Sequence, residues 1–400
     1  MDVELVAAKA AGWHEHGERT TPAALTVERL RPHFAALGIT RLARQTGLDR
    51  IGIPCFSAIR PAGLTLSVSQ GKGHNDASAM ASALMEAAEF AIAEQPQSRV
   101  RRATAAELQA MDEAFFSPRR LLPPAPRFQT DASIGWVEGR AWPSGDRLWM
   151  PLDAVTLGGE PGDLPAISRS SNGLASGNTP EEALFHGICE LVERDATSMW
   201  SLLPDAAKQA TEIGAARVDD PAIVLMCRQI ETAGFELRLF DQTTDLGVPC
   251  VMAVITERAD GLARRFDTAA GYGCHPVGVR AVSRAITEAA QTRITNIAGG
   301  RDDFLPAEYF EESDASTLFL AGEPSHDADA PVWLGYGTPL PELLDALAGR
   351  IGAIAEIGWA ELGGSSYGIS VVKALSTVLE DRETNVNWTP GKRVLRAVMQ

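Results

Sequence analysis

The strongest constraint on the fold of this chain is a nine-residue pattern that occurs three times. Its copies align without gaps as ASALMEAAE (81–89), FHGICELVE (185–193) and SRAITEAAQ (283–291). In each copy a polar residue is followed by Glu four positions later, and by an acid or amide three positions after that. Such spacings place the three side chains on one stripe of a helix. The pattern therefore predicts an internal repeat of three helices, each preceded by a Gly-containing stretch (GKGHND, ASGNTP and GYGCHP).

The polar stripe of each helix places carboxylates beside small apolar residues. The three stripes are Ser82/Glu86/Glu89, His186/Glu190/Glu193 and Arg284/Glu288/Gln291. Like charges on one stripe repel each other, and burial of an unpaired carboxylate is costly. One such stripe alone is explained by the frequency of Glu in helices. Three of them together favour a site in which hydrogen bonds, Arg or Lys, or a metal ion compensate the acids.

The composition is that of a folded, acidic protein with a sizeable core. Of the 400 residues, 45% are hydrophobic and 22% are charged, which are ordinary globular values. The net charge of −16 repels nucleic acid, so no nucleic-acid partner is expected. The five cysteines form no CxxC pair, which argues against a disulfide framework and a structural zinc. The amino terminus lacks a signal-peptide pattern and no apolar run reaches about 18 residues, so we expect no membrane segment and a cytoplasmic location.

Strand, turn and helix signals alternate along the chain, and no low-complexity linker divides them. We expect a helix over residues 77–93, and we expect FELRLFDQT and GVPCVMAVIT to be adjacent strands. Thr179 followed by Pro180 predicts the start of the second helix of the repeat. These signals favour an α+β or α/β class, with residues 1–60 as an N-terminal extension that packs on a core formed by residues 61–400.

Carboxylates from several helices suit a hard divalent cation, because such ions prefer oxygen ligands. Mg²⁺ usually takes one or two carboxylates and completes its shell with water and substrate phosphates. Lys72 in SQGKGHND is a candidate partner for a phosphate. The chain has no Walker A loop, no GxSxG elbow and no GxGxxG that follows a strand and opens a helix. A di-iron or di-manganese carboxylate protein is the rival, but only one stripe contains His, and strand signals surround it.

At these residues the sequence resembles the YcaO family. The resemblance rests on the helix Ser82-x3-Glu86-x2-Glu89, on SNGLASGN followed by His186-x3-Glu190-x2-Glu193, and on RAITEAAQTRITNIAGGRDDF. It extends from about Gly38 to the end of the chain. The resemblance implies an α+β fold with one YcaO-like catalytic domain over residues 61–400. It further implies an enzyme that uses ATP and Mg²⁺ to activate a backbone amide of a peptide or protein, by phosphorylating the amide oxygen.

The resemblance also implies roles for individual residues. The implied Mg²⁺ ligands are Glu86, Glu89, Glu190 and Glu193. The implied nucleotide contacts are Ser82, Glu86, His186, Glu190, Glu288, Gln291, Lys72, Arg293 and Lys9. His186 stands where the family often has Asn, and a packed histidine is its alternative; ordinary surface charge is the alternative for Lys72 and Arg293. No residue is identified as the general base.

The product of the reaction is indicated by two segments. The stretch from Gly38 to Gly73 resembles the branch that works with a TfuA partner and forms thioamides. The chain ends in NWTPGKRVLRAVMQ, without the Pro-x-Pro-x-Pro ending of many azoline-forming cyclodehydratases. We therefore expect a thioamide, with azoline or amidine formation as alternatives.

The resemblance also indicates what such an enzyme would work with. The partners that it implies are a precursor peptide or protein substrate and either a TfuA-like protein or a separate leader-binding protein, and a homodimer is left open. The alternative of another class is a catalytically silent member that binds a peptide or a partner. Both Glu pairs are complete, which favours the enzyme.

Overall fold

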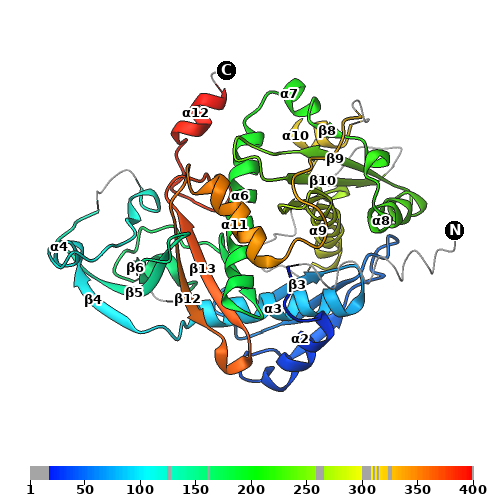
Figure 1. The fold of residues 1–400 in the computed structure, drawn as a ribbon. Helices are drawn as coiled ribbons and strands as arrows, with labels where there is room; N and C mark the ends of the chain where they lie inside the picture. Colours follow the sequence, from blue (N-terminus) through cyan, green and yellow to red (C-terminus); the bar gives the residue numbers. More distant parts are fainter. Residues whose placement is uncertain are drawn as a thin grey trace. The chain divides into compact units, whose positions relative to one another are not determined.

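The computed structural model describes residues 18–123, 128–159, 162–257, 265–299, 308–309, 311–312, 315–322 and 327–398. The chain divides into two compact units whose segments interleave along the sequence. The first unit comprises Met1–Ala62, Leu66–Ala87 and Leu203–Pro339, and the second comprises Gly63–Thr65, Ala88–Leu202 and Leu340–Gln400. Each unit is described by itself below, and Figure 1 shows the elements of both.

The first unit contains two antiparallel sheets. One has the order β1-β2-β3 and consists of β1 (Arg41–Arg44), β2 (Cys55–Ile59) and β3 (Val68–Lys72). The other has the order β11-β10-β9-β8 and consists of β8 (Glu212–Ile213), β9 (Phe235–Asp241), β10 (Cys250–Glu257) and β11 (Thr268–Cys274). The helices of this unit are α2 (Ala23–Leu30), η1 (Arg31–His33), α7 (Asp205–Gln209), η3 (Ala215–Arg217), α8 (Pro221–Thr232), η4 (Arg265–Asp267), α9 (Gly278–Ala298) and α10 (Ala315–Leu320).

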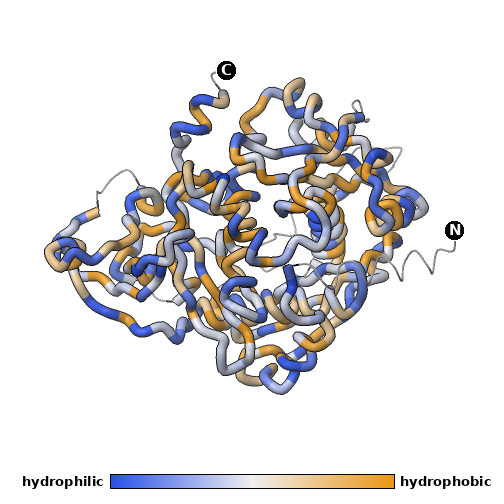
Figure 2. Tube along the Cα trace, in the orientation of Figure 1, coloured by the Kyte–Doolittle hydropathy of each residue, from blue (hydrophilic) through white to orange (hydrophobic). Residues whose placement is uncertain are grey.

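Helix α9 packs on β10 and β11 and covers a core of aliphatic side chains. The apolar residues of α9 that lie in this core include Ala285, Ile286 and Ala289, which face strand residues such as Val251. Gly271 of β11 allows this close packing, because a Cβ placed there would lie 2.0 Å from the backbone nitrogen of Ala289. Helix α8 packs on β9 and buries Ala222, Ile223, Met226 and Ile230. Figure 2 colours the trace of each element by hydropathy.

The second unit is built on one antiparallel sheet of order β4-β5-β12-β13-β7, with β6 paired to β5. Its strands are β4 (Val100–Thr104), β5 (Ser133–Trp142), β6 (Arg147–Pro151), β7 (Leu174–Gly177), β12 (Ile357–Gly363) and β13 (Ser370–Ser376). Its helices are α4 (Ala105–Ala110), η2 (Pro118–Arg120), α5 (Leu152–Val155), α6 (Pro180–Ser201), α11 (Leu340–Ile351), η6 (Ser365–Tyr367) and α12 (Lys392–Val398). Helix α6 packs on β7, β13 and α11.

The structure confirms the predicted α+β class and the predicted elements of the repeat. Helix α3 (Asp76–Glu94) covers the expected residues 77–93 and runs from the first unit into the second. Strand β9 pairs with β10 in antiparallel register, as expected for adjacent strands. Each helix of the repeat follows a strand directly, in the pairs β3–α3, β7–α6 and β11–α9. The expected boundary near residue 60, between an N-terminal extension and the core, stays a prediction. The sheet β1-β2-β3 has strands on both sides of this position.

Among the described residues, no helix has the length and apolar character that crossing a bilayer requires.

Candidate functional site

Each of the strands β3, β7 and β11 donates a backbone N–H group to one carboxylate of the repeat: two of these acids lie on α3 and one lies on α9. Glu86 accepts a hydrogen bond of 2.7 Å from the Gln70 nitrogen, and Glu288 accepts one of 3.3 Å from the Tyr272 nitrogen. In the second unit, one oxygen of Glu89 accepts from both the nitrogen and the hydroxyl of Ser176, at 2.9 and 2.6 Å. Hydrogen bonds to a carboxylate favour its charged form and fix its orientation. The strands β3, β7 and β11 therefore fix the orientation of these three acids.

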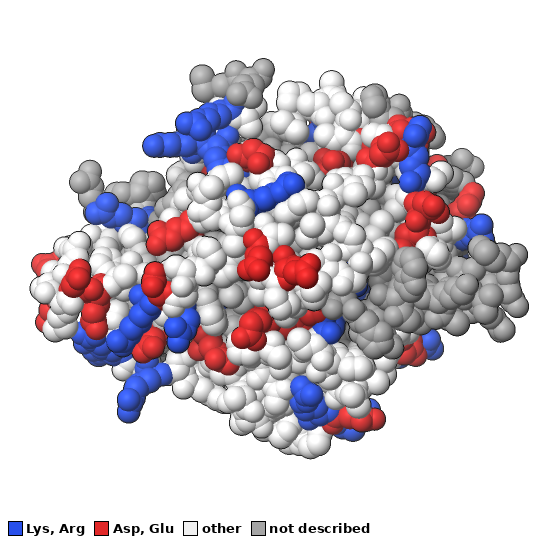
Figure 3. All heavy atoms as spheres, in the orientation of Figure 1, with Lys and Arg blue, Asp and Glu red and all other residues white. Residues whose placement is uncertain are grey.

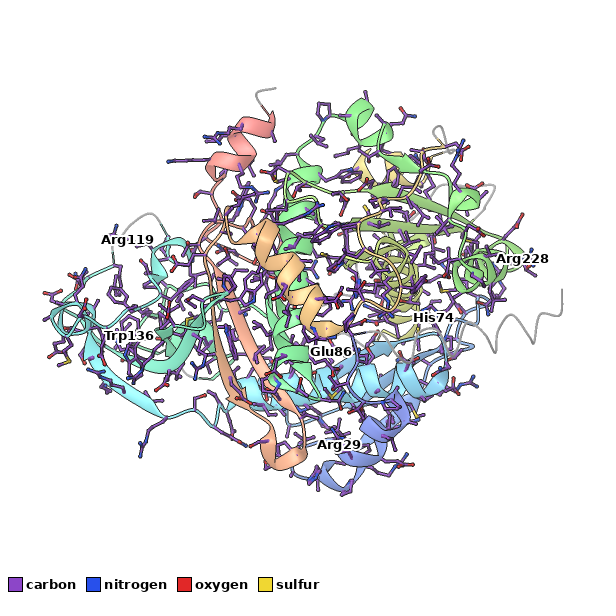
Figure 4. All side chains as sticks on the ribbon, in the orientation of Figure 1. Arg29, His74, Glu86, Arg119, Trp136 and Arg228 are labelled. Atoms are coloured by element: carbon purple, nitrogen blue, oxygen red, sulfur yellow. The ribbon has the colours of Figure 1, made fainter. Side chains whose placement is uncertain are left out.

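In the first unit, the end of β3 meets α9 through polar contacts. The ammonium of Lys72 forms an ion pair with Glu288, which joins two residues that the sequence assigns to the nucleotide. His74 Nε2 lies 2.7 Å from the Ser283 hydroxyl. Figure 4 shows His74 in the turn before α3 and Glu86 farther along that helix. A cation and an anion are thus held side by side, and the contact of Lys72 with a phosphate stays a prediction.

Four other predicted nucleotide contacts are less constrained by the structure. Ser82 on α3 and Gln291 on α9 are partly buried. Arg293 contacts Glu257 at 3.2 Å, and its guanidinium lies 4.3 Å from the centre of the Phe235 ring. These contacts give Arg293 a structural role within the first unit. Its contact with a nucleotide stays a prediction. Lys9 lies outside the described residues.

In the second unit, α6 presents His186, Glu190 and Glu193 on one stripe, as the spacing predicted. The helix begins as expected, because the Thr179 side chain accepts from the nitrogen of Glu182 and Pro180 occupies the first turn. Glu193 is 6% exposed and Glu190 is half-buried. His186 is 9% exposed, and its ring lies edge-on to the ring of Phe185 with 5.3 Å between the ring centres.

Lys373 of β13 is a charged residue of this region that the motif analysis did not find. Its side chain is 1% exposed, and its ammonium donates to the carbonyl oxygens of Ser170 and Asn172, at 2.5 and 2.6 Å. Burial lowers the pKa of Lys373 to about 8, while the charges of Glu190 and Asp381 act to raise it. The signal in the sequence is a single lysine within the apolar strand SVVKALS, and such a lysine needs buried partners.

The second half of α6 anchors the C-terminal segment. Asp195 accepts from the Glu380 nitrogen at 2.9 Å and from the Arg393 guanidinium at 2.5 Å. Burial raises the pKa of Asp195, although Arg393 and the Glu380 N–H act to lower it. Ser198 accepts from the nitrogen of Arg382 at 2.9 Å. Residues 380–393 are therefore fixed to the helix that carries Glu190 and Glu193.

The donor chemistry fits Mg²⁺ with a nucleotide. Within the described part of the chain, no cluster of three or more His, Cys, Asp or Glu forms a preassembled metal site. Mg²⁺ does not require one, because it usually binds one or two carboxylates and takes its other ligands from phosphates and water. The predicted ligands on α3 and α6 are carboxylates, the type of group that Mg²⁺ prefers, and their role stays a prediction. The face shown in Figure 3 intersperses acidic and basic side chains, with no continuous basic band over its described residues.

Comparison with known proteins decides the family. The family model described as YcaO cyclodehydratase, ATP- and Mg²⁺-binding, matches residues 70–377. The chain belongs to the YcaO family. The predicted family and its cofactors, ATP and Mg²⁺, are thereby confirmed. The roles of the individual residues stay predictions.

Two relatives of this YcaO protein match most of its length. A protein described as uncharacterized in the tfuA 3′ region of Rhizobium leguminosarum bv. trifolii is 42% identical over 305 residues, which cover 75% of this chain and 72% of the relative. An uncharacterized protein of Methanothermobacter thermautotrophicus is 36% identical over 298 residues, which cover 72% of this chain and 74% of the relative.

Solved structures with the same fold include other members of the family. The YcaO protein from Methanopyrus kandleri, bound with AMPPCP and Mg²⁺, matches with a TM-score of 0.70 at 22% identity, over 96% of this chain and 99% of that one. A heterocyclase in complex with substrate and cofactor matches with a TM-score of 0.73 at 20% identity, over 95% of this chain and 55% of that one. At these identities the matches establish the fold. The predicted class of ATP-dependent YcaO enzymes that modify peptides is confirmed at the level of the family.

Proposed function

We propose that this YcaO protein uses ATP to activate a backbone amide of a ribosomally made peptide or protein and forms a thioamide with a TfuA-like partner. The observation that carries the choice of product is the 42% identical relative from the tfuA 3′ region. The stretch Gly38–Gly73, which resembles the TfuA-associated branch, supports the same choice.

The chemistry of the proposed reaction balances with three reactants. A sulfur nucleophile adds to the amide carbon, and the amide oxygen takes the γ-phosphoryl group of ATP, releasing ADP. Phosphate then departs with that oxygen and leaves a C=S bond. Phosphorylation is needed because an amide oxygen is by itself a poor leaving group. An azoline would form in the same way if a Cys, Ser or Thr side chain of the peptide were the nucleophile, and an amidine if it were an amine.

The acids of the repeat would hold Mg²⁺ against the phosphates. Glu86, Glu89, Glu190 and Glu193 would bind the metal, which would supply positive charge against the transferring phosphoryl group. Their ionised state is favoured by the strand N–H groups that Glu86 and Glu89 accept from. The nucleotide contacts proposed in addition are Ser82, His186, Glu288, Gln291, Lys72, Arg293 and Lys9. In phosphoryl transfer, positioning and charge neutralisation provide most of the catalysis.

Calorimetric titration with ATP tests the nucleotide site. We expect binding that requires Mg²⁺ and is lost in Glu190→Gln. Glu181→Gln is the matched control, because Glu181 is an exposed acid in the first turn of the same helix. A folded wild-type protein that binds no Mg-ATP, alone or with a TfuA-like protein and peptide, would favour the silent binding member. Equal binding by Glu190→Gln would refute the assignment of Glu190.

Mass spectrometry of a peptide incubated with the enzyme, a TfuA-like protein, ATP and sulfide tests the product. Replacement of oxygen by sulfur raises the peptide mass and identifies a thioamide. Loss of water without sulfide identifies an azoline and refutes the proposed product while retaining the family chemistry. Incubation without ATP is the control.

A further inference from the structure

A polar pocket lies within the second unit, beside the part of α6 that carries Glu190. Its volume is about 240 Å³, and Lys373, Asn172, Leu191, Glu380, Asp381 and Trp388 are among the residues that line it. A buried water occupies about 30 Å³, and pockets for whole drug-sized ligands reach about 300–1,000 Å³. The pocket therefore has room for a short piece of a larger molecule.

Lys373 gives this pocket a buried cationic donor. An ammonium has three N–H donors, and two of those of Lys373 bond to the carbonyl oxygens of Ser170 and Asn172. Within the described residues no third acceptor is bonded to it. The remaining donor suits a carbonyl oxygen of a ligand.

Two buried acceptors line the same pocket. Asn172 is 7% exposed and its Oδ1 has no hydrogen-bond partner among the described residues. Glu380 is 3% exposed; its Oε2 accepts from the Trp388 indole at 2.9 Å, and its Oε1 is unpartnered in the described chain. A buried acceptor without a donor is unfavourable, so a ligand that donates to it gains affinity. The pocket therefore offers two acceptors to a ligand that presents N–H groups.

We propose that this pocket binds a backbone amide of the peptide substrate, with Lys373 donating to its carbonyl oxygen and Glu380 or Asn172 accepting from its N–H group. The inference rests on the proposed function and names the residues that would hold the peptide beside α6. A peptide amide carries one strong acceptor and one donor, which matches the two kinds of group in the pocket.

The charges of the pocket disfavour simpler ligands. A phosphate would meet the carboxylates of Glu380 and Asp381, and an amine would meet the ammonium of Lys373. Arg119, labelled in Figure 4, also lines the pocket but is exposed, so its charge is well solvated. A neutral amide avoids both repulsions. It can also accept a hydrogen bond from Lys373 and donate one to Asn172 or Glu380.

Saturation-transfer NMR with acetyl-glycyl-glycine N-methylamide as the probe tests the inference. A probe of this size is expected to bind with a Kd on the order of millimolar. The variants are Lys373→Met and Glu380→Gln, and each should weaken binding about tenfold, because each removes a bond to a charged group. Glu383→Gln is the matched control, since Glu383 is an exposed acid of the same segment that contacts Arg194. Circular dichroism establishes whether each variant is folded. If Lys373→Met does not fold, Glu380→Gln alone tests the inference.

The outcomes separate this inference from the proposed function. Probe binding that falls in the two pocket variants and persists in Glu383→Gln supports the amide pocket. No binding to the wild type, equal binding by all variants, or stronger binding of acetate than of the probe overturns it. Mg-ATP titration of the same samples tests the nucleotide site independently, so normal ATP binding without probe binding refutes the amide pocket alone.

Discussion

Replacement of Gly271 by Ala tests how closely α9 must approach β11. The added Cβ would lie 2.0 Å from the Ala289 nitrogen and 2.5 Å from the Ala285 oxygen. Carbon contacts are normally about 3.5–4.0 Å, so the helix would have to move by roughly 1.5 Å. Both contacting atoms belong to the backbone, and no change of rotamer can relieve the clash. We expect a cost near the upper end of the overpacking range, about 3 kcal/mol.

The assay for this prediction is differential scanning calorimetry of the wild type, Gly271→Ala and Gly335→Ala. With an unfolding entropy of about 2.1 cal/mol/K per residue over the 400 residues, a cost of about 3 kcal/mol lowers the Tm of the first variant by about 3–4 °C. Gly335 is the control, since no heavy atom lies within 4 Å of a Cβ placed there, and its Ala variant should melt within about 1 °C of the wild type. A Tm for Gly271→Ala within about 2 °C of the wild type would refute the reasoning. Such a result would mean that α9, which carries Glu288 and Gln291, can move away from β11 without loss of stability.

The remaining predictions concern buried charges. Burial lowers the pKa of Lys373 from 10.5 to about 8. Between pH 8 and pH 10.5 this lysine is therefore protonated in the unfolded chain but largely neutral in the folded protein. The stability of the wild type relative to Lys373→Met should therefore rise from pH 8 to pH 10.5, by up to roughly 3 kcal/mol, and urea unfolding that shows a flat or falling difference contradicts this. Burial alone would raise the pKa of Glu18, but His275 and Arg280 hold it well below its ordinary value. Glu18→Gln should cost about 3–5 kcal/mol by leaving the Arg280 charge buried, and an unchanged urea midpoint would contradict this. Asp195→Asn should speed hydrogen exchange at the nitrogen of Glu380, and unchanged protection would refute the anchoring role.

Local structure was largely predictable, because it follows from the spacing of side chains along one segment. The helix expected over residues 77–93 is α3, and the start of α6 at Thr179 and Pro180 follows from groups within four residues. The pairing of β9 with β10 was predictable because the two strands are neighbours in sequence. The division into two interleaved units was not, because it depends on which distant segments pack together.

The sequence by itself determined the threefold repeat, its carboxylate stripes, the α+β class and the family. These properties depend on residue identity at spacings of three and four and on short motifs. Only the tertiary structure decided which partners those acids have. Lys72 meets Glu288 across 216 positions, and Lys373 reaches the carbonyl of Asn172 across 201 positions. Pairing of this kind is set by sheet order and by the packing of helices on strands, so that the antiparallel register of β13 with β7 brings Lys373 opposite Leu174.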